Sequence, residues 1–144
     1  MNSLELAKSN IRQAEERFRH AKEALTSGNF PYVVRQCQEA VELALKASLR
    51  LVGVEPPKWH DVGPVLKRER EKFPKWFQEK VDELASISRS LRKERELAMY
   101  GDEEAGVSPE ELYIRSDAEY ALKLTEIVLF NANKLLSGIE NRYI

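Results

Sequence analysis

The sequence lacks the residues that many metal and cofactor sites require. It contains one cysteine, Cys37, and two histidines, His20 and His60, and neither histidine stands three residues after a glutamate. These counts exclude a zinc site, and they exclude a di-iron bundle, which needs a Glu-x-x-His step on each of two helices. None of the six glycines has another within four residues, which excludes the glycine-rich loops that cradle phosphates or dinucleotides. We therefore expect no metal and no cofactor.

The sequence also lacks a dominant charge and any long apolar run. Its 23 Lys and Arg residues nearly balance 24 Asp and Glu residues, so any contact with nucleic acid must come from a local patch. No apolar run is long enough to cross a bilayer, and the polar N-terminus has no apolar signal core. A single cysteine excludes an internal disulfide. We expect a cytoplasmic protein without a membrane partner, and 144 residues suit a single domain over residues 1–144.

Apolar residues recur every three or four positions in four long segments, which is the periodicity of amphipathic helices. The segments are residues 4–25, 30–51, 74–100 and 116–139. The first two are separated by only a few residues, so we expect them to pack antiparallel. No alternating strand pattern is present. The sequence predicts an all-α, up-and-down bundle of four long helices with additional short ones.

Capping residues mark the expected helix starts. Asn29 precedes the second helix, which has a proline in its first turn. Asp61 begins a short helix that we expect to continue through the charged run 67–72. Ser108 with Glu111 predicts a capping box, and Ser116 with Glu119 predicts a second one at the start of the last helix.

Two of the chemically reactive side chains have simple structural interpretations. Cys37 falls on the apolar face of the second helix, which predicts a buried thiol. His20 lies beside the apolar stripe of the first helix, which predicts a solvated ring. His60 stands in a proline-rich loop before Asp61, which could orient its ring; either local packing or a ligand or proton-transfer role is compatible with this position.

A cluster of cations lies near the end of the third long segment. Cations there offset the partial negative charge of helix carbonyls by about 0.3–1 kcal/mol each, which suffices for Arg92 and Lys93. Arg95 instead falls on the apolar stripe one turn before Ala98, so it needs a negatively charged partner. The pattern leaves open whether this partner is a carboxylate of the protein, a phosphate or a second subunit. We expect Tyr100 to place its ring on the core and its hydroxyl in the same cleft.

Polar residues on the second helix give a further candidate. Glu42 and Lys46 form an i,i+4 pair in the favourable order, which is sufficient as a structural interpretation. Gln38 and Glu39 add polar groups near the buried seam. These residues also allow a polar cleft beside the second helix.

Four stretches of the sequence together resemble the HEPN family, whose name abbreviates "higher eukaryotes and prokaryotes nucleotide-binding". The stretches are QEAVELALKASLRLVG (38–53), HDVGPVL (60–66), RELAMYGDEE (95–104) and SPEELYIRSDAEYALKL (108–124), and the resemblance covers nearly the whole chain, in order and with similar spacing. The resemblance implies a bundle of four or five helices that dimerises. It also implies a role in nucleotide binding, in partnership with a minimal nucleotidyltransferase, or in RNA cleavage within toxin–antitoxin and defence systems.

The ribonuclease branch of that family uses an Arg followed, after four to six residues, by a His. Here Arg92 and Arg95 are present, but the positions where the histidine would stand contain none: Leu97, Ala98, Met99, Tyr100, Gly101 and Asp102. Metal-free RNA cleavage needs a group that transfers a proton near neutral pH, and a tyrosine such as Tyr100 is a poor substitute for histidine in this role. The departure argues against an enzyme.

Three functions follow. The first is a non-catalytic homodimer that binds a nucleotide or RNA phosphate through Arg92, Arg95 and Tyr100, beside a separately encoded nucleotidyltransferase, with Glu42, Lys46 and His60 as further candidate contacts. The second is a metal-independent ribonuclease that uses Arg95, Tyr100 and His60. The third is a structural adaptor that pairs with itself or with another protein.

Overall fold

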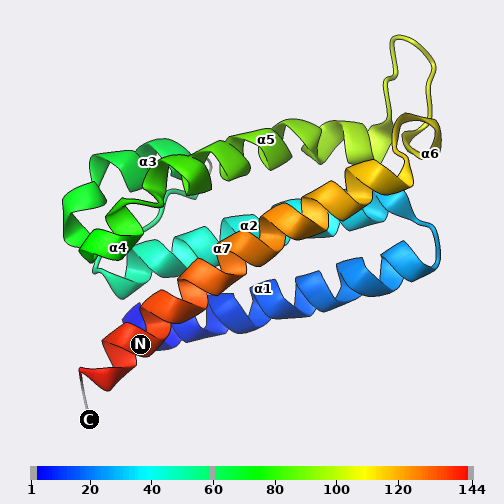
Figure 1. The fold of residues 1–144 in the computed structure, drawn as a ribbon. Coiled ribbons are helices and arrows are strands. Elements are labelled where there is room, and N and C mark those ends of the chain that lie inside the picture. The colour runs from blue at the N-terminus through cyan, green and yellow to red at the C-terminus, as the bar shows by residue number, and fades with distance from the viewer. Residues whose placement is uncertain (1–2, 59–60, 143–144) are drawn as a thin grey trace.

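The computed structural model describes residues 3–58 and 61–142, and in these ranges the chain forms an elongated helical bundle (Figure 1). Four of its helices are long: α1 (Ser3–Thr26), α2 (Phe30–Leu51), α5 (Val81–Tyr100) and α7 (Arg115–Asn141). The shorter elements are α3 (Val62–Arg68), the 3₁₀ helix η1 (Arg70–Lys72), α4 (Lys75–Gln78) and α6 (Pro109–Leu112). The predicted all-α bundle of four long helices with short additional ones is confirmed.

Helix α2 is the centre of the bundle, because it packs against α1, α5 and α7. Its start follows the predicted chemistry: the Asn29 side chain accepts a hydrogen bond from the Tyr32 backbone N–H, and Pro31 lies in the first turn. Helices α1 and α2 form the expected antiparallel hairpin (Figure 1). Cys37 of α2 is completely buried, as predicted, and burial raises the pKa of its thiol to about 12.

The prediction of one continuous helix over residues 74–100 is wrong. The chain forms the single turn α4, breaks at Glu79 and Lys80, and begins again as α5 at Val81. Aromatic packing accounts for the break: the Phe77 ring stacks on Phe73, with 4.4 Å between centroids, and the Gln78 side chain donates to the Phe73 carbonyl. These contacts fix α4 against the preceding loop. The apolar periodicity of the segment therefore continues across two separate helices.

The charged run 67–72 and the start of the last helix also differ from expectation. Helix α3 ends at Arg68, and the rest of the run is the separate turn η1. Helix α7 begins at Arg115 instead of after a Ser116 cap, because the Asp117 carboxylate accepts from the Ile114 backbone N–H at 2.9 Å. The capping box of Ser108 with Glu111 is confirmed.

A tight hairpin joins α5 to α6 and projects from the end of the bundle (Figure 1). Gly101 ends α5 with a φ of 75°, a conformation that favours glycine. Asp102 and Val107 then pair through two backbone hydrogen bonds of 2.8 and 3.0 Å. In the described residues, no helix combines the length and apolar character needed to cross a membrane.

Candidate functional site: a groove around Arg95

Side chains from three helices surround a shallow groove on the exposed side of α2, between α1 and α5. Its first hollow has a volume of about 210 Å³ and is lined by Arg17, Arg35, Gln38, Glu39, Glu42, Leu43 and Arg95. An adjoining hollow of about 460 Å³ is lined by Arg92, Lys93, Arg95, Glu96, Met99 and Tyr100. Arg95 lines both hollows, and we call the two together the Arg95 groove.

Arg95 is exposed, which corrects the expectation that it lies on the buried stripe of its helix. Leu91 and Ala98 are buried on either side of it in sequence, but at this turn of α5 Glu94 is the partly buried residue and Arg95 is exposed. The buried Tyr113 packs there, and its hydroxyl donates to Glu94 Oε2 at 2.6 Å. Arg95 is thereby directed into the groove. Among the described residues, none forms a hydrogen bond or an ion pair with its guanidinium.

Glu42 gathers three polar partners at the floor of the groove. Its carboxylate lies 3.3 Å from Arg92 Nη1 of α5 and 3.5 Å from Lys46 Nζ, which confirms the predicted i,i+4 pair. The Gln38 side-chain amide donates to the same carboxylate at 3.4 Å. Arg92 is therefore paired within its own chain, whereas Arg95, one turn later on α5, is not.

Glu39 has the same role for two arginines that the sequence did not identify as site residues. Its carboxylate lies 3.2 Å from Arg17 Nε of α1 and 3.3 Å from Arg35 Nε of α2. No motif connects positions 17 and 35; the antiparallel hairpin of α1 and α2 brings them to one carboxylate. The single carboxylate therefore offsets about half of the charge of these two cations.

The remaining candidate residues, Tyr100 and the two histidines, differ in their position relative to the groove. Tyr100 lines the second hollow, but its ring does not lie on the core, because 61% of the residue is exposed. Its hydroxyl and ring are therefore open to solvent at the rim of the groove. His60 lies outside the described residues. His20 is partly exposed and lies 3.2 Å from Glu16 on α1, away from the groove.

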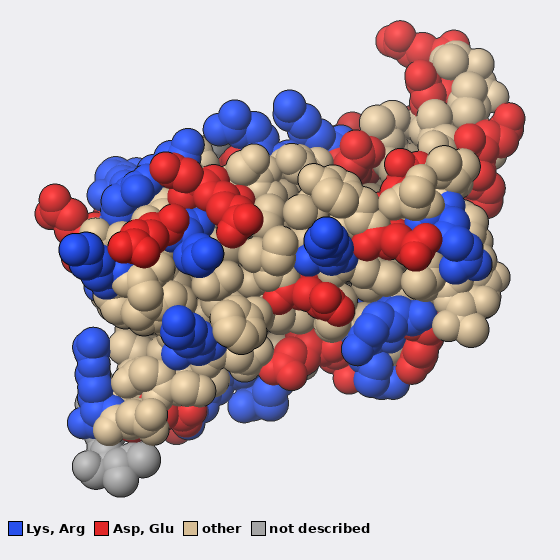
Figure 2. Space-filling model, viewed as in Figure 1, with Lys and Arg blue, Asp and Glu red and all other residues tan. Residues whose placement is uncertain are grey.

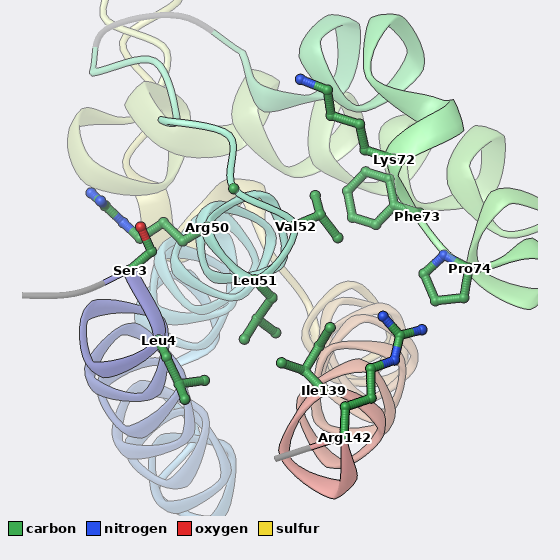
Figure 3. A pocket seen from close by; sticks show the side chains of 11 residues that line it. Ser3, Leu4, Arg50, Leu51, Val52, Lys72, Phe73, Pro74, Ile139 and Arg142 are labelled. Atoms are coloured by element: carbon green, nitrogen blue, oxygen red, sulfur yellow. The ribbon is translucent and has the colours of Figure 1, made fainter.

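A different hollow of about 550 Å³ lies at the opposite end of the bundle, near the described ends of α1 and α7 (Figure 3). Leu51 and Ile139 point toward one another across it, and Arg142 extends beside Pro74. Two of its three cations are paired, Arg50 with Glu55 and Lys72 with Glu69. None of the predicted binding residues that the structure describes lines this hollow.

The surface charge agrees with the near-neutral composition. On the face shown in Figure 2, basic and acidic side chains are intermixed, with acidic residues on the projecting hairpin after α5. No large area of one sign covers this face, so attraction of an anion must depend on local groups such as Arg95. In the described ranges, no group of three or more His, Cys, Asp or Glu side chains is arranged to hold a metal ion.

The protein is a helical bundle with an arginine-lined groove on its central helix, α2. The HEPN domain family matches residues 7–135, and the chain belongs to that family. Among solved structures, the crystal structure of TT1696 from Thermus thermophilus has a similar fold, with a TM-score of 0.72 and 24% sequence identity. The match covers 94% of this chain and 99% of the TT1696 chain. No curated protein sequence matches significantly.

Proposed function

We propose that this HEPN-domain protein binds a nucleotide or an RNA phosphate in the Arg95 groove, without catalysing a reaction on it. Membership of the family supports a function related to nucleotides or RNA in broad terms. The observation that carries the finer proposal is the position of Arg95: exposed, between two hollows, and without a partner among the described residues.

The chemistry of binding follows from the donors at the groove. A phosphate accepts two parallel hydrogen bonds from a guanidinium, and a charge-assisted bond of this kind is about twice as strong as a neutral one. Lys93 is exposed on the same wall and adds positive charge. The exposed Tyr100 ring offers a stacking surface for a base. Glu42 pairs with both Arg92 and Lys46 at the floor, so we assign these three residues a positioning role.

The proposal includes a homodimer that acts beside a separately encoded nucleotidyltransferase, as in a toxin–antitoxin pair. Large apolar side chains are exposed on α7 and at the end of α5, including Tyr120 at 62%, Phe130 at 68% and Tyr100 at 61%. Aromatic residues are enriched at protein–protein interfaces, so these exposed side chains support a dimer. Light scattering at micromolar concentration tests the dimer, and a monomeric mass would remove this part of the proposal.

A titration of the purified protein with ATP, followed by calorimetry, tests the binding function. We expect saturable binding that weakens at least about tenfold in Arg95→Ala, because a hydrogen bond to a charged group contributes about 1.5–3 kcal/mol. Arg89→Ala is the matched control, since Arg89 is exposed on the same helix and is not among the groove residues. Absence of binding, or equal binding by Arg95→Ala and wild type, would refute the proposal.

A further inference from the structure

The amide of Gln38 has one buried polar atom without a partner in the described part of the chain. Gln38 is only 3% exposed, and its Oε1 accepts no hydrogen bond from residues 3–58 or 61–142. More than about 90% of buried polar groups in proteins are paired, and an unpaired one costs about 1–3 kcal/mol. Gln38 lines the first hollow of the Arg95 groove. The unfilled acceptor therefore lies beside the site where the proposed ligand enters.

The orientation of this amide is fixed by its neighbour. Gln38 Nε2 donates to Glu42 Oε1, and the opposite orientation would turn the amide oxygen toward a carboxylate. Oε1 must therefore remain the free atom. None of the three arginines of this hollow donates to Oε1: Arg17 and Arg35 direct Nε to Glu39, and Arg95 forms no hydrogen bond with a described residue. A ligand that brings one N–H or O–H group to this atom would satisfy it.

From these contacts we infer the class of ligand: a nucleotide whose base carries an exocyclic amino group, which donates to Gln38 Oε1 while the phosphate binds Arg95. The inference rests on the proposed function and adds base selectivity to it. A base with a carbonyl at the same position would place lone pairs against Gln38 and the Glu42 carboxylate. Because Gln38 is covered in the free protein, binding requires a shift of side chains in the hollow, and such rearrangements are common at binding sites.

The experiment compares nucleotides that differ in this group and in the hydrogen on the adjacent ring nitrogen. ATP and ITP carry the same triphosphate, as do CTP and UTP, and in each pair a carbonyl replaces the amino group. We expect wild type to bind ATP more tightly than ITP, and CTP more tightly than UTP, by about three- to tenfold. In Gln38→Met, which keeps a similar side-chain volume without the acceptor, both ratios should fall to within about twofold.

Two controls separate the possible failures. Gln36→Met makes the same change two residues earlier on α2, outside the groove residues, and should keep the wild-type ratios. Melting curves establish that Gln38→Met is folded, and Gln38→Glu, which keeps an acceptor, should retain the preference. If all four nucleotides bind equally through Arg95, the inference is wrong and the proposed function stands. If none binds, both are wrong.

Discussion

Arg92 and Glu42 lie on different helices, fifty residues apart in sequence, and Arg92 Nη1 lies 3.3 Å from Glu42 Oε1. This contact distinguishes Arg92 from Arg95, although the sequence predicts both as contacts of a phosphate. The carboxylate offsets the charge of Arg92, whereas Arg95 points into a groove with no partner among the described residues. Both side chains of the pair are partly exposed, so the contact adds about 1 kcal/mol or less to stability. Its main effect is on the charge available to a ligand.

Glu42→Gln should strengthen the binding of an anion. The substitution removes the negative charge closest to Arg92 and Lys46, so we expect inorganic tripolyphosphate to bind about two- to fivefold more tightly. This probe has no base, so it reports on charge alone. Calorimetry measures the change, with the exposed Glu126→Gln on α7 as a control for net charge. Weaker binding by Glu42→Gln would contradict the prediction.

Tyr113→Phe should lower the free energy of unfolding by about 1–2 kcal/mol, because it removes a hydrogen bond to the Glu94 carboxylate. Burial and the neighbouring Glu94 raise the pKa of Tyr113 above its usual value. The unfolded chain releases this proton from about pH 10, while the folded protein retains it, so stability should fall as the pH rises above that value. Chemical denaturation between about pH 9 and pH 11 should show a steeper loss in wild type than in Tyr113→Phe. Parallel slopes would show that Tyr113 is not responsible.

Gly101→Ala should destabilise the protein by about 3 kcal/mol or more, through both its positive φ and a steric clash. An added Cβ would lie 2.2 Å from the Val107 carbonyl oxygen, which is held by a hydrogen bond from the Asp102 backbone N–H. Gly106→Ala is the matched control in the same hairpin. It also has a positive φ, but its Cβ would have no atom within 4 Å, so it should cost only about 1–2 kcal/mol. Thermal melts that show equal decreases in melting temperature for the two variants would disprove the steric argument.

The Cys37 thiol should be unreactive in the folded protein. Burial raises its pKa to about 12, so almost no thiolate exists at pH 8. We expect a disulfide reagent such as DTNB to label the protein only after denaturant is added, with a stoichiometry of one thiol. Fast labelling of the native protein would mean that α2 is less tightly packed than its contacts indicate.

The protein should leave RNA intact in the presence of a chelator. The stretch from Leu97 to Asp102 has no histidine to transfer a proton, and a tyrosine hydroxyl such as that of Tyr100 is a poor proton acceptor near neutral pH. Incubation of a fluorescently labelled single-stranded RNA, followed by gel electrophoresis, measures cleavage. Cleavage by wild type that is absent in Arg95→Ala would identify a ribonuclease instead. In that case His60→Ala would test the loop histidine as the proton-transfer group.

The sequence alone determined the elements of the bundle, because amphipathic periodicity and capping chemistry are local. The Asn29 cap, the Ser108 box and the buried Cys37 all follow from residues within one helical turn. The same locality explains the errors. The break at Glu79 and Lys80 depends on Phe77 packing against Phe73. At the start of α7, the sequence offers both Ser116 and Asp117 as capping residues, and in the structure Asp117 forms the capping hydrogen bond.

The site was decided by tertiary structure. The periodicity of α5 placed Arg95 among buried residues, but α5 packs with Glu94 toward Tyr113, nineteen residues later in sequence, and Arg95 is exposed. The hairpin of α1 and α2 likewise brings Arg17 to Glu39, which also pairs with Arg35. Whether a charged side chain is paired depends on residues of other helices. The apolar periodicity of one helix contains no information about which residues of other helices will lie beside it.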